Sequence, residues 1–114
     1  MNEEVAWDSE RRLWTGGAAR YRQLVDFQCV MAFPAPAGIM RFDAIMNSID
    51  KMPRWSSVEM SDKVVTHPAK DITVLAYKAT ARREGEKPYE AFCTSTYCCF
   101  EGGWRLVQHQ QSPA

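Results

Sequence analysis

The chain has 114 residues, of which 46% are hydrophobic and 25% are charged, and its 14 basic residues balance its 14 acidic residues. This length and composition are typical of one globular domain, which we expect to span residues 1–114. A net charge of zero provides no electrostatic attraction for nucleic acid or anionic lipid, so we expect neither as a partner.

Targeting signals and cysteine pairing are both unexpected in this sequence. Polar residues follow Met1 directly, and no segment approaches the ~20 apolar residues of a membrane span. We therefore expect a cytoplasmic protein without membrane contact. In that reducing compartment the cysteines, which lack CxxC spacing, should be free thiols that mostly fill the core. They are Cys29, Cys93, Cys98 and Cys99.

The N-terminal part of the chain predicts two helices in close succession. Residues 3–14 have a helical pattern that stops at Gly16-Gly17, and glycine is favoured where helices end. Residues 18–28 then predict a second, shorter helix, because several larger side chains recur at helical spacing. These are Tyr21, Leu24, Val25 and Gln28.

A brief strand and a third helix follow. Residues 29–33 are apolar and are closed by Pro34 and Pro36; since proline cannot donate to a strand ladder, this segment predicts a brief or edge strand. The clearest amphipathic helix comes next and ends before Pro53. Its apolar face carries Phe42, Ile45, Met46, Ile49 and Met52, which we interpret as core residues.

After Pro53 the apolar period changes from ~3.6 to ~2, which marks a change from helix to strand. Strands are predicted over residues 55–65, 72–83, 89–100 and 104–111, with turns near His67-Pro68, at residues 84–87 and at Gly102-Gly103. Helices followed by consecutive strands predict an α+β fold, with the helices packed on one face of a strongly curved antiparallel sheet.

The element order and three phrases resemble the nuclear-transport-factor-2-like (NTF2-like) superfamily, and within it a small bacterial branch of polyketide-cyclase-like proteins of unknown function. The phrases are LVDFQCVMAFPAPAGIMRFDAI, VLAYKATARREG and YEAFCTSTYCCFEGGWRLVQHQQSP. The most specific parts are residues 95–97, 103–107 and 109–110. The resemblance covers nearly the whole chain and implies a cone with an internal pocket and a homodimer formed through the sheet. One departure is Ala18, where relatives usually carry an Asp.

The register of the last hairpin decides which side chains share a face. A turn with one bulged residue near Gly102-Gly103 places six side chains together: Ser95, Tyr97, Cys99, Val107, His109 and Gln111. A strict two-residue turn shifts the partner strand by one residue. We adopt the bulged register because the resemblance places the pocket at these positions.

The preceding strand contributes Tyr77, Ala79 and Ala81 to one face, and its two alanines leave room for a cavity. Trp55 is expected near the rim. The predicted ligand-binding residues are Trp55, Tyr77, Ser95, Tyr97, His109 and Gln111.

His109 is the candidate acid or base of this pocket, because an unperturbed imidazole titrates near pH ~6.5. The alternative is a structural histidine hydrogen-bonded to a neighbouring Tyr or Ser. His67, before Pro68, is interpreted as a solvated turn residue. Two histidines without a carboxylate at matching spacing give no metal-site signature, and we expect no metal and no cofactor.

Two chemistries known from other proteins are not expected. The isomerases that the chain resembles use a carboxylate on the first strand as base and a protonated acid as donor. Alignment places Ala32 and Ser95 at those two positions, so double-bond isomerisation lacks its groups. Cys99 has no evident base beside it and is interpreted as a filler residue rather than a nucleophile.

Three function classes remain open. The first is a dimeric module that binds a small apolar or aromatic molecule, with Trp55, Tyr77 and Tyr97 as walls. The second is an enzyme of the polyketide-cyclase or isomerase-like type with His109 as acid or base, and the third is a structural dimer. We favour the first because no second titratable group is evident beside the histidine.

The expected dimer interface is the outer face of the sheet. Phe92, Phe100 and Leu106 alternate with the pocket positions and would give that face an apolar surface.

Overall fold

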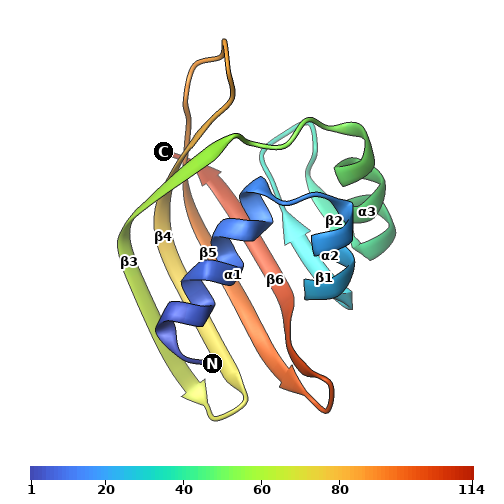
Figure 1. Cartoon of the computed structure of the whole chain (residues 1–114), viewed down its shortest axis with the longest axis vertical. Coiled ribbons are helices and arrows are strands. Elements are labelled where there is room, and N and C mark those ends of the chain that lie inside the picture. Colours follow the sequence, from blue (N-terminus) through green and yellow to red (C-terminus); the bar gives the residue numbers. More distant parts are fainter.

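The computed structural model describes residues 1–114 and contains three helices and six strands (Figure 1). The helices are α1 (Glu3–Thr15), α2 (Ala18–Leu24) and α3 (Phe42–Lys51). The strands are β1 (Val25–Ala32), β2 (Ile39–Arg41), β3 (Ser57–Ala69), β4 (Ile72–Arg82), β5 (Tyr89–Phe100) and β6 (Gly103–Pro113).

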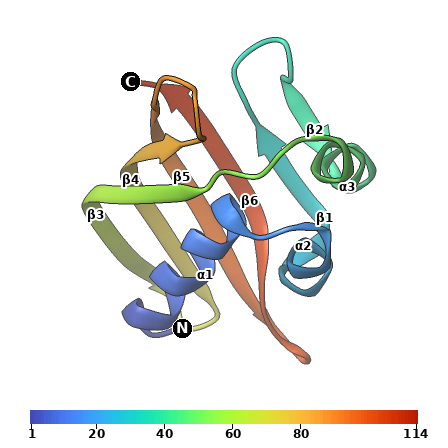
Figure 2. The ribbon, with the colours of Figure 1, turned by 45° about the horizontal axis from the view of Figure 1, so that its top comes forward.

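All six strands form one sheet in the order β2-β1-β6-β5-β4-β3, and the three helices lie on one face of it (Figures 1 and 2). This arrangement confirms the predicted α+β fold. The sheet is mixed, because β1 runs parallel to β6, so the prediction of an antiparallel sheet was wrong at this one pairing. The sheet also curls less strongly than expected.

The segment after α2 departs most from the sequence prediction. The second helix ends at Leu24 instead of Gln28, because residues from Val25 onward pair with strands that are distant in the sequence. Strand β1 has eight residues and lies between β2 and β6, so the prediction of a brief or edge strand was wrong. Tertiary pairing here overrides the local helical spacing.

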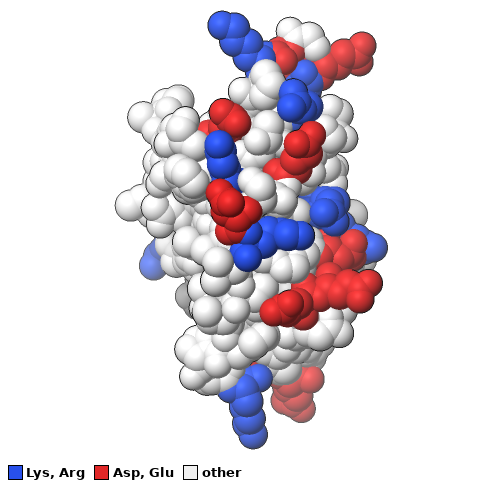
Figure 3. Space-filling view, turned by 90° about the vertical axis from the view of Figure 1, so that its left-hand side faces the viewer, with Lys and Arg blue, Asp and Glu red and all other residues white.

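Strand β3 continues through the predicted turn at His67-Pro68 and ends at Ala69. Because β3 is an edge strand, one side of its backbone needs no ladder partner, and a proline is tolerated there. His67 is exposed, and its Nδ1 lies 3.2 Å from Thr73 Oγ1. On the side of the molecule that carries β3, acidic and basic side chains are interleaved (Figure 3).

Both ends of α1 are fixed by specific contacts. The Asn2 side chain accepts a hydrogen bond of 2.8 Å from the Val5 N–H, and the Gly16 N–H donates to the Arg12 carbonyl at 2.7 Å. A Cβ on Gly16 would lie 2.5 Å from that carbonyl oxygen, which explains why this position requires glycine. Gly17 has open space around it.

The core lies between the helices and the inner face of the sheet. One cluster joins α2, α3 and β1 and includes Tyr21, Leu24, Met31, Ile45 and Leu106. The other lies beneath α1 and includes Ala6, Trp14, Leu75, Tyr77 and Ala79. The outer face of the sheet has no helix over it (Figure 2).

The β5–β6 hairpin contains the predicted bulge, but at a different place. Ser95 pairs with His109, so these two side chains share a face as predicted, whereas Tyr97 pairs with Leu106. The extra residue is therefore Val107 within β6 rather than a residue of the turn. The inner face therefore carries Leu106, which is fully buried, in place of Val107. The prediction that Leu106 lies on the outer face was wrong.

Candidate functional site

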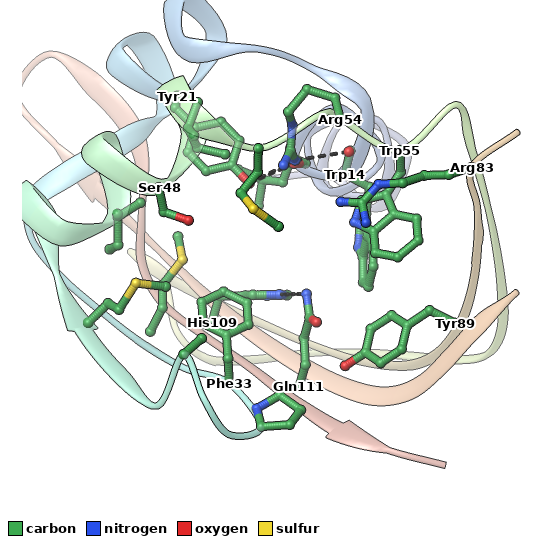
Figure 4. Close-up of a pocket in the computed structure, with 18 of the residues that line it drawn as sticks. Trp14, Tyr21, Phe33, Ser48, Arg54, Trp55, Arg83, Tyr89, His109 and Gln111 are labelled. Carbon is green, nitrogen blue, oxygen red and sulfur yellow. Dashed lines mark hydrogen bonds between the residues drawn. The ribbon is translucent and has the colours of Figure 1, made fainter. Parts of the chain in front are cut away.

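A cavity of about 540 Å³ opens between α3, the loop after β1 and the end of the sheet that carries Tyr89, His109 and Gln111 (Figure 4). Its walls are mostly apolar and include Trp14, Met31, Phe33, Ile49, Trp55 and Tyr89. Polar side chains interrupt these walls: Ser48, Arg54, Arg83, Glu86, Lys87, His109 and Gln111. This volume is in the usual range of small-molecule sites, ~300–1,000 Å³.

The six sequence-predicted site residues form two layers. Trp55, His109 and Gln111 line the cavity. The other three, Tyr77, Ser95 and Tyr97, are buried beneath it and surround a residue that the sequence analysis did not select.

That residue is Glu10, which is fully buried on α1. Its carboxylate accepts three hydroxyl hydrogen bonds: from Tyr77 at 2.5 Å, from Ser95 at 2.5 Å and from Tyr97 at 2.7 Å. Trp14 Nε1 donates to the Tyr77 oxygen at 2.9 Å, which extends the network to the cavity wall. Such a density of donors is what a buried carboxylate requires.

The charge state of Glu10 follows from these contacts. Burial alone would raise its pKa, but hydrogen bonds from His109, Ser95 and Tyr77 together lower the pKa below the ordinary 4.5. Glu10 is therefore a carboxylate at neutral pH. Burial, and then the Glu10 charge, raise the pKa of Tyr77 and of Tyr97 well above 10.0, so both phenols stay protonated donors.

The same network fixes the protonation of His109. Ser95 has one hydroxyl proton, which it donates to Glu10, so the 2.7 Å contact between Ser95 Oγ and His109 Nδ1 requires an N–H on Nδ1. Nδ1 also lies 3.4 Å from the Glu10 carboxylate. The other ring nitrogen, Nε2, lies 3.1 Å from the side-chain nitrogen of Gln111. Because an amide N–H donates, Nε2 accepts with its lone pair, next to the cavity (Figure 4).

The expectation that no second titratable group lies beside His109 was therefore wrong. Glu10 belongs to α1, far from His109 in the sequence, and packing of α1 across the sheet brings them together (Figure 1). A sequence signal was present, because Ala6, Glu10 and Leu13 fall at i, i+4 and i+7 on one helix face. A carboxylate on an apolar helix face is a candidate buried group.

Arg54 holds the wall of the cavity in place. Its guanidinium donates to the carbonyls of Gly16 at 2.7 Å and Trp14 at 2.9 Å, and also to that of Leu13, all at the C-terminal end of α1. It also donates to the Tyr21 hydroxyl at 3.2 Å. A cation at the C-terminal end of a helix is attracted by the negative pole of the helix dipole. Arg54 therefore holds α1 against the segment before β3.

No group of three or more His, Cys, Asp or Glu side chains could hold a metal ion. No helix is both long and apolar enough to cross a membrane.

Comparison with solved structures identifies the fold. An NTF2-like protein from Cytophaga hutchinsonii superimposes with a TM-score of 0.83 at 14% identity, over 100% of both chains. An NTF2-like protein of unknown function in nutrient uptake, from Rhodospirillum rubrum, gives 0.79 at 19% identity, over 96% of this chain and 98% of that one. The association domain of C. elegans CaMKII gives 0.76 at 16% identity, over 96% of this chain and 90% of that one.

No protein-family model and no curated protein matches the chain. The structural similarities establish that the chain has the NTF2-like fold, as its sequence resemblance predicted.

Proposed function

We propose that this protein binds a small molecule with an apolar or aromatic body in the cavity. The observation that carries the proposal is a mostly apolar wall in which two polar groups, His109 Nε2 and the Gln111 amide, lie next to each other. Small-molecule sites typically combine apolar walls with a few converging polar groups, which orient the ligand.

Aromatic side chains of the cavity suit a flat ligand. Trp55 stacks on Tyr89 with ring centroids 5.6 Å apart and an interplanar angle of 15°, and Phe33 lies 5.9 Å from the His109 ring. In this proposal Trp55, His109 and Gln111 contact the ligand. Tyr77, Ser95 and Tyr97 act indirectly, by holding Glu10 and thereby His109.

A neutral fluorescent probe tests the binding function. N-phenyl-1-naphthylamine should bind the wild type with enhanced, saturable fluorescence. Ser48→Phe places a ring in the cavity and should abolish that binding, whereas Asn47→Phe, on an exposed neighbouring position of α3, should leave it unchanged. Equal binding by both variants would contradict the proposal.

General acid–base catalysis is a second candidate function, favoured by the pairing of Glu10 with His109. In such a reaction His109 Nε2 takes a proton from a carbon next to a substrate carbonyl, and the enolate later recovers a proton. The Nδ1–H remains on the ring, where the Glu10 carboxylate stabilises the imidazolium.

Deuterium exchange distinguishes catalysis from binding alone. With 2-acetonaphthone in deuterium oxide, a catalyst would accelerate loss of the methyl proton signal, and His109→Gln would return the rate to that of buffer. Binding of the ketone without accelerated exchange would leave the binding function and contradict the catalytic one.

Self-association through the outer face of the sheet is part of the proposed function. Phe92 and Phe100 are 55% and 44% exposed on this face, and Val30 is 45% exposed. An uncovered apolar sheet face favours association. The similarity to the CaMKII association domain supports this proposal at the level of fold. Sedimentation analysis should give a dimer, which Phe92→Lys should dissociate and Val5→Lys, at an exposed position of α1 on the other side of the sheet, should not.

A further inference from the structure

The charged side chains that line the cavity are predominantly cationic. Arg54, Arg83 and Lys87 oppose a single acid, Glu86. The Arg54 guanidinium already donates hydrogen bonds to the carbonyls at the end of α1. Neither Arg54 nor Arg83 forms an ion pair with a carboxylate.

Arg83 is the cation with unused hydrogen-bonding capacity. Its guanidinium carbon lies 3.8 Å from the centre of the Trp55 ring, which fixes the plane of the group against the cavity wall (Figure 4). Nη2 donates to the Pro53 carbonyl at 2.9 Å, and Nε is buried without a partner. A guanidinium held in this way is preorganised for a planar anion.

The opposite end of the cavity does not carry the same excess charge. His109 lies there, but the buried Glu10 carboxylate is 3.4 Å from its Nδ1 and compensates any positive charge on the ring. An anionic group is therefore stabilised at Arg83, whereas a neutral hydrogen-bonding group suits His109 and Gln111.

From this arrangement we infer that the ligand is an organic anion: a flat apolar body with a carboxylate that binds Arg83. The body lies between the Trp55–Tyr89 pair and Phe33, and its far end reaches toward His109 and Gln111. This inference rests on the proposed binding function and names the chemical class of its ligand.

Arg82 provides a matched control for Arg83. It is the neighbouring residue in the chain, is exposed, does not line the cavity, and approaches Glu59 at 3.9 Å on β3. Both Arg→Gln changes remove one positive charge from the protein. A difference between the two variants therefore reports the position of the guanidinium rather than the net charge.

The test compares 2-naphthoate with 2-naphthamide, which share a ring system and differ in charge, by isothermal titration calorimetry at neutral pH. The wild type should bind the carboxylate about tenfold more tightly than the amide, as expected for a charge-assisted bidentate contact. Arg83→Gln should lose this preference and keep its affinity for the amide, and Arg82→Gln should behave as the wild type.

The possible failures are distinguishable. Equal affinity for the two probes in the wild type, or a preference that survives Arg83→Gln, would overturn the anionic ligand class while leaving the cavity as a binding site. Absence of binding by both probes would overturn the inference together with the proposed function on which it rests.

Discussion

Replacing Glu10 with Gln tests the buried network most severely, because it keeps the shape of the side chain and removes its charge. Glu10 is 0% exposed and accepts hydroxyl hydrogen bonds from Tyr77, Ser95 and Tyr97. The Gln carbonyl can keep the bond from Tyr97. Its amide nitrogen would instead face the hydroxyls of Tyr77 and Ser95, which act as donors.

In this orientation two charge-assisted hydrogen bonds are lost, and in the flipped orientation one is lost, each worth about 1.5–3 kcal/mol. The negative charge that faces His109 Nδ1 is lost in both. Local rearrangement recovers part of this, so we expect Glu10→Gln to reduce the free energy of unfolding by about 3–5 kcal/mol. A domain of this size is stable by about 5–15 kcal/mol, so the variant should still fold. Its Tm should fall by about 12–20 °C.

The pH dependence supplies a second test with a defined sign. Because the pKa of Glu10 is lowered on folding from an ordinary 4.5, its contribution to stability is fully present above that value and is lost as the pH falls below it. The difference in Tm between the wild type and Glu10→Gln should be largest at neutral pH and shrink in acid.

Thermal unfolding followed by circular dichroism measures both effects. Glu4→Gln is the matched control, since Glu4 is exposed on the same helix, and its loss should cost less than about 1 kcal/mol. A Glu10→Gln variant as stable as Glu4→Gln, or a difference that grows in acid, would refute the account of the network.

Four further predictions concern other parts of the structure. His109→Gln should weaken probe binding and also lower the free energy of unfolding by about 1–3 kcal/mol, because Nδ1 contacts the buried network and Nε2 lies next to the cavity. Calorimetry measures the first effect and thermal unfolding the second. Tyr97→Phe should show a similar loss of stability with an unchanged probe Kd, since Tyr97 does not line the cavity. A larger Kd would contradict its indirect role. Arg54→Gln should cost about 2–4 kcal/mol by releasing the end of α1, as judged by urea unfolding, and wild-type stability would argue against that fastening. Gly16→Ala should destabilise by about 1–3 kcal/mol, whereas Gly17→Ala, which has open space around it, should cost less; the reverse order would show that crowding against the Arg12 carbonyl is not what requires glycine at position 16.

Those parts of the fold that depend on local sequence patterns were predictable. The change of apolar period after Pro53 predicted the four strands β3 to β6, and the glycines of the last hairpin marked its turn. Pairing between distant segments was not predictable in this way. Val25 looked helical by spacing but joins a strand parallel to β6, and the bulge at Val107 is set by packing inside the sheet.

The candidate site was also predictable only in part. Strand alternation together with the family resemblance selected His109 and Gln111, and Trp55 was expected near the rim; all three line the cavity. Glu10 was missed because its helix is rich in charged residues, most of which are exposed, and because its position on one helix face with Ala6 and Leu13 was not used. That position indicates burial, but it does not indicate the three hydroxyls that the carboxylate meets. Its burial depends on how α1 crosses the sheet.

The central claim is that the cavity receives a ligand against the Nε2 face of His109, whose Nδ1–H is held by Ser95 and Glu10. The imidazole ¹H–¹⁵N spectrum tests it directly, because the chain has two histidines and the exposed His67 serves as an internal reference. The account predicts a proton on His109 Nδ1, and an Nε2 signal that shifts saturably on titration with 2-naphthamide while His67 stays unchanged. A His109 protonated on Nε2 alone, or a ring signal indifferent to the bound probe, would contradict it.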